Sequence, residues 1–290
     1  MNKFIFIVCT HRSGSTLLKN IIDANSNVVM LSDEPNISDP WHFTFLNHLN
    51  KIGDLKQDRN IFALTDLLKS GKIYSTFWEN LALEEHFDFK NLNNLFLNSD
   101  RSHKSIFTII LNEYKSFRNK SIVGAKYPVH PKHINLLYEW YPNAKYIFLS
   151  RNIFASATSR LNDKATIGRK RKFFLLSSLI HYATLIWFLL DYNWTARSYL
   201  KNKNKSNTKH IKYESLVVAP RKTITNMCDF LEIKYEDRML NSTGKSSSYM
   251  DINYSSNDMK RLNRWKNKIN KIDFYIISVL TKKSRIFFGN

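Results

Sequence analysis

A loop with the composition of an anion-binding site follows the first apolar run of the chain. Residues 4–9 read FIFIVC, typical of a strand buried on both faces, and residues 10–18 read THRSGSTLL, leading into a helical pattern. Backbone N–H groups at a helix N-terminus, hydroxyl groups and the Arg12 side chain can all donate to one bound anion. Gly14 lets the backbone approach that ligand closely. The loop therefore predicts a phosphate-like ligand, although a simple serine helix cap has a similar sequence.

The same loop argues against a nucleoside triphosphatase. The P-loop motif places a lysine directly after its last glycine, to reach the β- and γ-phosphates. Here Ser15 follows Gly14, and we find no acidic strand end suited to Mg²⁺. The sequence thus predicts a phosphate cradle poorly suited to metal-assisted ATP or GTP hydrolysis, which points away from a kinase.

The segments that position this loop alternate between strand and helix patterns. Such alternation predicts an α/β fold with a central, mostly parallel sheet flanked by helices. Residues 41–118 interrupt the alternation with helix-like stretches and predict a helical insertion. We find no repeat or linker, so we expect one domain over residues 1–290. The predicted strands are residues 4–9, 122–125, 145–149 and 209–212, and the predicted helices are residues 16–24, 131–141, 153–161 and 220–231.

The net charge of the 290-residue chain is +20 and is unevenly distributed. Residues 1–150 carry 17 basic and 14 acidic side chains (net +3), and residues 151–290 carry 27 and 10 (net +17). A polyanionic partner is one interpretation. A solvated lysine-rich surface, as in the run at residues 201–205, is the other and accounts for most of the excess. No recognition helix or RNA-binding aromatic motif accompanies the charge, so no specific nucleic acid is expected.

Cysteine and histidine usage gives no sign of a metal site. The two cysteines, Cys9 and Cys228, form no ligand spacing, and the nine histidines lack an H-E-x-x-H pattern. Two cysteines also form no disulfide framework, which indicates a reducing compartment. Because the first strand begins directly after Met1-Asn2-Lys3, we expect no signal peptide and a cytoplasmic protein.

Residues 173–190 form a long apolar stretch preceded by the basic run RKRK at residues 169–172. The stretch is barely long enough to span a bilayer and contains Ser177, Ser178, His181 and Thr184. We therefore expect a buried helix. A peripheral membrane contact through the basic flank remains as the alternative.

Five segments carry a family resemblance. Residues 12–18 resemble the 5′-phosphosulfate loop of sulfotransferases that use 3′-phosphoadenosine 5′-phosphosulfate (PAPS), and most closely tyrosylprotein sulfotransferases and related bacterial enzymes. Four later segments are similar to family segments in the same order: SDEP at residues 32–35, GAKYP at 124–128, PNAKYIFLSRN at 142–152, and IKYESLV at 211–217. The resemblance implies a P-loop-like three-layer fold, PAPS as donor, PAP (adenosine 3′,5′-bisphosphate) as product, and no metal.

The resemblance also implies roles for individual residues. Glu34 corresponds to the general base that takes the acceptor proton, with Asp33 as a substitute, and Arg12 and Lys126 correspond to cations that stabilise the transferred group. A histidine base, His11 or His42, is the rival assignment. Glu214 is expected to be structural. The implied cofactor-binding residues are Arg12, Ser13, Gly14, Ser15, Thr16, Leu17, Arg151, Ser159, Tyr213, Ser248 and Arg264.

The expected function is transfer of a sulfuryl group from PAPS to an acceptor hydroxyl. By analogy, we expect a carbohydrate or glycolipid acceptor, with the insertion at residues 41–118 contributing to its binding. A protein-tyrosine acceptor is the alternative. Other function classes are a nucleotide-binding protein that has lost catalysis, and a nucleic-acid-binding protein suggested by charge alone.

Overall fold

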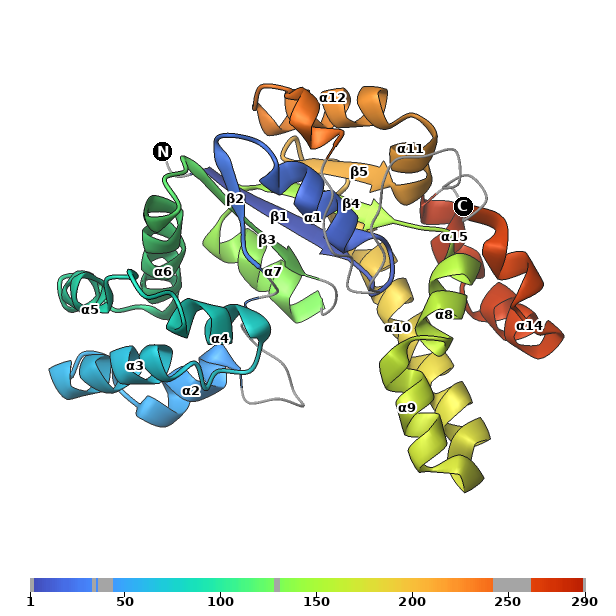
Figure 1. Cartoon of the computed structure of the whole chain (residues 1–290), viewed down its shortest axis with the longest axis horizontal. Coiled ribbons are helices and arrows are strands. Elements are labelled where there is room, and N and C mark those ends of the chain that lie inside the picture. The colour runs from blue at the N-terminus through green and yellow to red at the C-terminus, as the bar shows by residue number, and fades with distance from the viewer. Residues whose placement is uncertain (1–2, 33–34, 36–43, 128–130, 242–261, 289–290) are drawn as a thin grey trace. The chain divides into compact units, whose positions relative to one another are not determined.

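Five parallel strands in the order β2-β3-β1-β4-β5 form the central sheet, with helices around it (Figure 1). The computed structural model describes residues 3–32, 35, 44–127, 131–241 and 262–288. Every residue of the first strand from Phe4 to Cys9 is buried, as expected for a strand covered on both faces. The predicted α/β fold is thus confirmed. The strands are β1 (Lys3–Cys9), β2 (Val28–Met30), β3 (Ile122–Tyr127), β4 (Lys145–Ser150) and β5 (Thr208–Lys212).

Helices fill the connections between these strands. No strand is assigned among the described residues 44–118, so the predicted helical insertion is confirmed. The first half of the chain contains α1 (Ser15–Asp23), α2 (Phe45–Ile52), α3 (Asp58–Ser70), α4 (Thr76–Ala82), α5 (Phe89–Leu97), α6 (His103–Phe117) and α7 (Pro131–Trp140). The second half contains α8 (Ile153–Leu161), α9 (Lys164–Lys172), η1 (Phe174–Leu176), α10 (Ser177–Asn202), α11 (Tyr213–Val218), α12 (Pro220–Leu231), η2 (Asp237–Met239), η3 (Arg264–Asn267), α14 (Lys271–Leu280) and α15 (Lys282–Phe288).

Internal contacts divide the chain into two compact units. Unit 1 comprises Met1–Phe6, Ser26–Tyr127 and Lys132–Ala144, and therefore holds the helical insertion. Unit 2 comprises Ile7–Asn25, Pro128–Pro131 and Lys145–Asn290, and therefore holds the loop after β1. The single domain expected from the sequence stays a prediction.

In unit 1, close packing around β3 and the aromatic side chains of the insertion build the core. Gly124 lies where a Cβ atom would meet the Ile5 carbonyl oxygen at 2.9 Å and collide with Met30, so only glycine fits between β1 and β2. In the insertion, the buried rings of Phe45 and Trp78 stack with centroids 5.1 Å apart. Buried aromatic pairs of this kind supply much of the packing energy of small cores.

In unit 2, the helices α8, α10, α14 and α15 share one hydrophobic cluster. Each presents apolar side chains at helical spacing, so their burial stabilises the four helices together. The cluster consists of Ile153, Phe154, Ala157, Leu161, Leu185, Phe188, Leu189, Tyr192, Ala196, Ile277 and Phe288.

The expectation of a buried helix at residues 173–190 is wrong for much of that segment. Phe173, all of η1 and one face of α10 are exposed, while the other face of α10 enters the unit 2 cluster. By length and composition alone, Phe174–Asn202 could cross a membrane, with mean hydropathy 1.6 in its most apolar window and only 22% of that window buried. An apolar run in a sequence does not tell which of its faces the fold will cover.

Candidate active site

The loop after β1 presents the N-terminus of α1 without a side-chain cap. Gly14 occupies the N-cap position with φ of +92°, and no side chain hydrogen bonds to the first turn. The early N–H groups of a helix lack intrahelical partners, so those of Ser15, Thr16 and Leu17 are available to an anion. The Ser13 hydroxyl donates to the Thr10 carbonyl oxygen at 2.7 Å, so this side chain braces the loop.

Gly14 is required here for a second reason, its contact with Tyr213. A Cβ atom at position 14 would collide with the Tyr213 ring, and its left-handed φ also disfavours any other residue. Tyr213 is buried at the start of α11, directly after β5. The ring therefore holds the cradle loop against the end of β5.

Two arginines connect this loop to β4 and α8. Arg12 Nε donates to Ser159 Oγ at 3.1 Å, and Arg151 Nη1 donates to the Arg12 carbonyl oxygen at 3.2 Å. The Arg151 guanidinium also lies 4.5 Å from the Tyr213 ring centroid, a cation–π contact. The structure thus brings together five predicted residues from separate parts of the chain: Arg12, Gly14, Arg151, Ser159 and Tyr213.

The electrostatics of this cluster favour an anionic ligand. Burial lowers the pKa of Arg12. The charge of Asp163 raises this pKa, whereas the charges of Arg151 and Arg160 lower it. Asp163 pairs with Arg160 at 2.8 Å, whereas neither Arg12 nor Arg151 forms an ion pair with any described residue. Arginine keeps its proton at physiological pH, so the lowered pKa mainly records the cost of burying this charge, with a smaller contribution from the two neighbouring arginines. A bound anion would offset that charge.

Unsatisfied donors also fit a phosphate group. The Nε atom of Arg151 is buried without a hydrogen-bond partner, as are the hydroxyls of Ser156 and Thr158 on α8. Buried polar atoms normally have partners, and arginine binds phosphate through two adjacent N–H groups. The residues present therefore fit a phosphorylated ligand.

The sequence analysis missed Asn152 and Asp163, two residues of the polar network beside Arg151 and Arg12. Glu214 accepts a hydrogen bond from the Asn152 backbone N–H at 2.8 Å, and Asn152 Oδ1 caps α8 through the Ala155 N–H at 3.1 Å. This network fixes the backbone beside Arg151 and agrees with the structural role expected for Glu214. Asp163 caps α9 through the Thr166 N–H at 2.7 Å. A capping pattern at Asp163 was available in the sequence, but its pairing with Arg160 was not.

The comparisons with known proteins agree with this geometry. A family model described as the sulfotransferase family matches residues 5–237. The chain belongs to the sulfotransferase family. The expected PAPS-dependent enzyme class is confirmed at the level of this family. No curated protein sequence gives a significant match.

Two solved sulfotransferase structures have a similar fold. The sulfotransferase domain from the curacin biosynthetic pathway is 18% identical with a TM-score of 0.55, and the alignment covers 97% of this chain and 98% of that domain. The sulfotransferase domain of the Synechococcus PCC 7002 olefin synthase is 17% identical with a TM-score of 0.55, with 97% and 94% covered. These similarities support the fold.

The remaining predicted residues of this sulfotransferase are Lys126, Arg264, His11, Glu34, Asp33, His42 and Ser248. Lys126 is the second-to-last residue of β3, in unit 1. Arg264 is exposed at the start of η3, whose Trp265 stacks on Phe154 of α8 with centroids 5.0 Å apart. His11 is exposed in the cradle loop. Glu34, Asp33, His42 and Ser248 lie outside the described residues.

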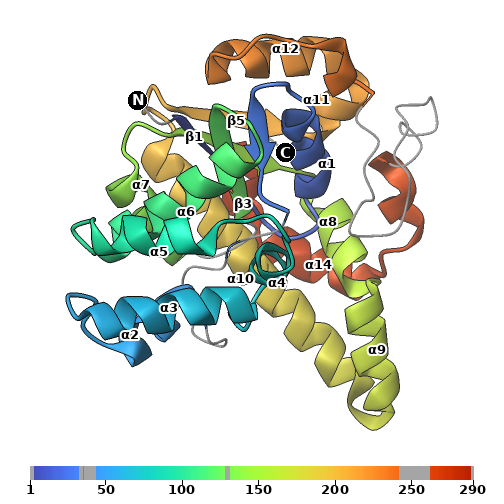
Figure 2. The ribbon, with the colours of Figure 1, turned by 60° about the vertical axis from the view of Figure 1, so that its left-hand side comes forward.

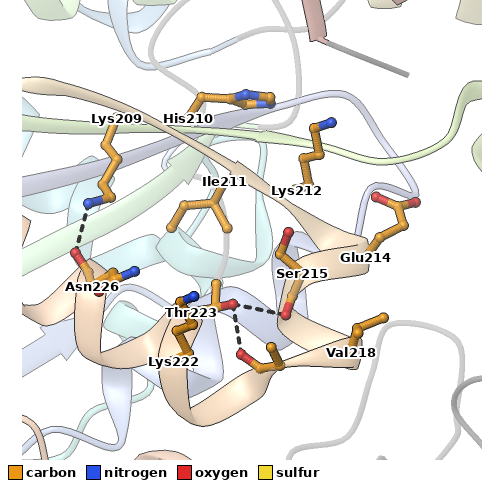
Figure 3. Close-up of a pocket in the computed structure, with 11 residues that line it drawn as sticks. Lys209, His210, Ile211, Lys212, Glu214, Ser215, Val218, Lys222, Thr223 and Asn226 are labelled. Carbon is orange, nitrogen blue, oxygen red and sulfur yellow. Dashed lines mark hydrogen bonds between the residues drawn. The ribbon is translucent and has the colours of Figure 1, made fainter.

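Unit 2 also has a cavity of about 620 Å³ (Figure 3). It is lined by β5, α11 and α12, and none of the predicted nucleotide-binding residues lines it. Several of its polar groups are already bonded: Lys209 Nζ donates to the Asn226 carbonyl at 2.8 Å, and the Thr223 hydroxyl to the Ser215 carbonyl at 2.9 Å. Burial lowers the pKa of His210, which also lines it, to about 4, so that ring is neutral. Because none of the predicted nucleotide-binding residues lines this cavity, substitution of one of its lysines, such as Lys222, serves as a control for the removal of a positive charge.

A smaller cavity of about 370 Å³ lies in unit 1, within the insertion. Its wall carries several polar groups: Asn80 donates to the Ser32 hydroxyl at 3.2 Å, and Arg118 and Glu84 pair at 3.5 Å. Ser32 stands two positions before Glu34 in the sequence. The volume falls in the range typical of small-molecule sites.

Proposed function

We propose that this protein transfers the sulfuryl group of PAPS to a hydroxyl of a carbohydrate or glycolipid acceptor. The observation that carries the proposal is the contact cluster of Arg12, Ser159, Arg151 and Tyr213 at the N-terminus of α1. Membership of the sulfotransferase family supports the reaction class.

In this proposal the donor nucleotide is held at its two anionic ends. The 5′-phosphosulfate accepts hydrogen bonds from the loop at residues 12–17, and the 3′-phosphate binds Arg151 and Ser159. The buried Arg151 Nε and the closeness of Arg12 to Ser159 support this arrangement. Fixing a reactant at two points orients the sulfur for attack and lowers the entropic part of the barrier.

The chemical step is an in-line displacement at sulfur. The acceptor oxygen forms the new S–O bond as the bond from sulfur to the 5′-phosphate oxygen breaks, and that electron pair leaves with PAP. Glu34 takes the acceptor proton as general base. Arg12 and Lys126 stabilise charge on the leaving oxygen and the transferred group, the role of preorganised cations in transition-state stabilisation.

The acceptor assignment rests on the cavity in the insertion. Hydroxyl-rich ligands need several hydrogen-bonding side chains in one pocket, and Ser32, Asn80, Glu84 and Arg118 provide them. Four apolar or aromatic residues, Phe77, Leu81, Leu83 and Tyr114, line the rest of the cavity. The polar side chains support a sugar acceptor, and the apolar ones would also accommodate a tyrosine ring, so the test includes both acceptor classes.

The test is transfer of ³⁵S from labelled PAPS to a panel of free sugars, glycolipids and tyrosine-containing peptides. We expect label in sugar or glycolipid products, with transfer reduced in Arg118→Ala and unchanged in the distant control Lys222→Ala. Label found only in the peptides would show that the acceptor is a protein tyrosine and not a sugar. PAP binding without transfer to any acceptor would support the non-catalytic alternative.

A further inference from the structure

Exposed apolar side chains gather where α9 turns back into α10. We call Phe173, Phe174, Leu175 and Leu176 the apolar tip. The exposed fraction is 72% for Phe174 and 83% for Leu175. Figures 1 and 2 both show α9 and α10 side by side, ending at this turn. Four consecutive large apolar residues exposed at one turn mark an interaction site.

The apolar surface continues along one face of α10. Its exposed positions follow the 3.6-residue period of a helix, so they form one stripe about 17 Å long. The opposite face carries Leu185, Phe188 and Leu189, which are buried in the unit 2 cluster. The helix is therefore apolar on both faces, and among the described residues only one face is covered by protein. The stripe consists of Leu179, Ala183, Ile186, Trp187 and Leu190.

Positive charge lies beside this apolar surface. Between Lys164 and Leu190 the chain has five Lys and Arg residues and no Asp or Glu. Four of the five are consecutive, at residues 169–172, and Arg169, Arg171 and Lys172 are exposed. Apolar side chains next to clustered cations are typical of surfaces that bind anionic membranes.

A polar network in unit 2 holds the hairpin close to the apolar tip. Lys170 Nζ lies 2.8 Å from His181 Nδ1, and His181 Nε2 lies 2.9 Å from a carboxylate oxygen of Asp273. Asp273 is buried and also accepts from Asn270 Nδ2 at 2.9 Å. These contacts join α9, α10 and α14, so the tip and the cations project from a fixed support.

We propose that the hairpin formed by α9, η1 and α10 docks this protein peripherally on an anionic lipid surface. The apolar tip enters the boundary between headgroups and acyl chains, and Arg169, Arg171 and Lys172 contact lipid phosphates. A transmembrane course is not compatible with this fold, because Leu185, Phe188 and Leu189 of the same helix are packed in the protein core. Docking is independent of the acceptor, although it would bring a glycolipid headgroup within reach of a bound enzyme.

The test measures binding of the full chain to vesicles of phosphatidylcholine, with and without phosphatidylglycerol, by co-sedimentation. We expect the mixed vesicles to bind more tightly. Arg169→Gln/Arg171→Gln/Lys172→Gln should weaken that binding on the order of 100-fold, about fivefold per cation. Phe174→Ser/Leu175→Ser should weaken it by about tenfold or more.

Matched controls separate docking from general surface effects. Lys201→Gln/Lys203→Gln/Lys205→Gln removes the same charge elsewhere, and Leu83→Ser removes an equally exposed apolar residue of the insertion. Both should bind vesicles as the wild type does, and circular dichroism should show all variants folded.

Three results would overturn the proposal. They are no binding to mixed vesicles, equal losses in the hairpin and control variants, or a dimer in sedimentation velocity that Leu175→Ser dissociates. The last would assign the surface to a second copy of the chain. Because vesicle binding needs no catalysis, its failure would leave the sulfuryl-transfer proposal standing, and the reverse also holds.

Discussion

Arg12 Nε donates a hydrogen bond to Ser159 Oγ at 3.1 Å across 147 positions of sequence. The two residues come from segments to which the family resemblance gives different tasks, the 5′-phosphosulfate loop and the 3′-phosphate site. Their contact means that the two ends of the proposed nucleotide site form one structure within unit 2. A substitution at either end should therefore change the affinity for the nucleotide.

Removing Arg151 should weaken PAP binding far more than removing Ser159. A charge-assisted bond to phosphate contributes about 1.5–3 kcal/mol, so Arg151→Ala should lose on the order of 10- to 150-fold in affinity. Ser159→Ala removes one hydroxyl, which accepts from Arg12 Nε, but leaves both guanidinium charges in place, so it should lose less, about 10-fold. Titration calorimetry with PAP measures both, with Lys222→Ala as the control. Equal affinity in wild type and Arg151→Ala would remove Arg151 from the nucleotide site.

Gly14→Ala should destabilise the fold as well as the site. The alanine would hold a left-handed φ of +92° and collide with the Tyr213 ring, which we expect to cost about 1–3 kcal/mol or more. Gly14→Ala/Tyr213→Ala relieves the collision but not the backbone strain, so it should be less destabilised than the sum of the two single variants. Denaturant unfolding measures all three. Additive losses would show that the ring does not constrain this position.

Glu34→Gln and Lys126→Ala should slow turnover without weakening PAP. Loss of a general base typically costs on the order of 10²- to 10⁴-fold in rate. The amide of Gln cannot take the acceptor proton, although its shape is nearly that of Glu. Labelled PAPS turnover and PAP calorimetry on the same preparations separate rate from affinity. Near-normal turnover in Glu34→Gln would show that Glu34 is not the base, and Asp33, His11 and His42 would be the remaining candidates.

Asp191 should make stability depend on pH. Burial raises its pKa to about 7, although the Arg160 charge lowers it, and Oδ1 has no hydrogen-bond partner. The folded state therefore holds this proton more tightly than the unfolded state, whose pKa is near 3.8. The free energy of unfolding is therefore highest below about pH 4, where Asp191 is protonated in both states. It falls by on the order of 4 kcal/mol as the pH rises to about 7.

Asp191→Asn removes this titration. Its stability advantage over the wild type should grow between pH 4 and 7 and then level off, as followed by chemical unfolding at several pH values. An advantage that does not change with pH would mean that Asp191 is ionised in the fold.

Several elements could be predicted from sequence because their signals are local. The predicted helices at residues 153–161 and 220–231 match α8 and α12 in both bounds, since each begins at a clear cap or proline. The strand β2 was missed because Val28–Met30 is too short to show a period. The exposure of α10 was missed because composition does not reveal which face of an apolar helix has a partner.

The residues of the candidate site also divide into those with a local signal in the sequence and those without one. The loop at residues 12–17 and Arg151 stand beside recognisable neighbours in sequence. The contact of Tyr213 with Gly14, and the hydrogen bond from Arg12 to Ser159, depend on packing between distant segments. Such contacts follow from the tertiary fold, which local propensity does not specify.

The most direct test compares the binding of PAP with that of adenosine 5′-monophosphate, which lacks the 3′-phosphate. Our account predicts that PAP binds on the order of 100-fold more tightly, and that Arg151→Ala reduces this ratio to about 10 or less, the part left to Ser159. Equal affinities for the two nucleotides in the wild type, or an unchanged ratio in Arg151→Ala, would contradict it.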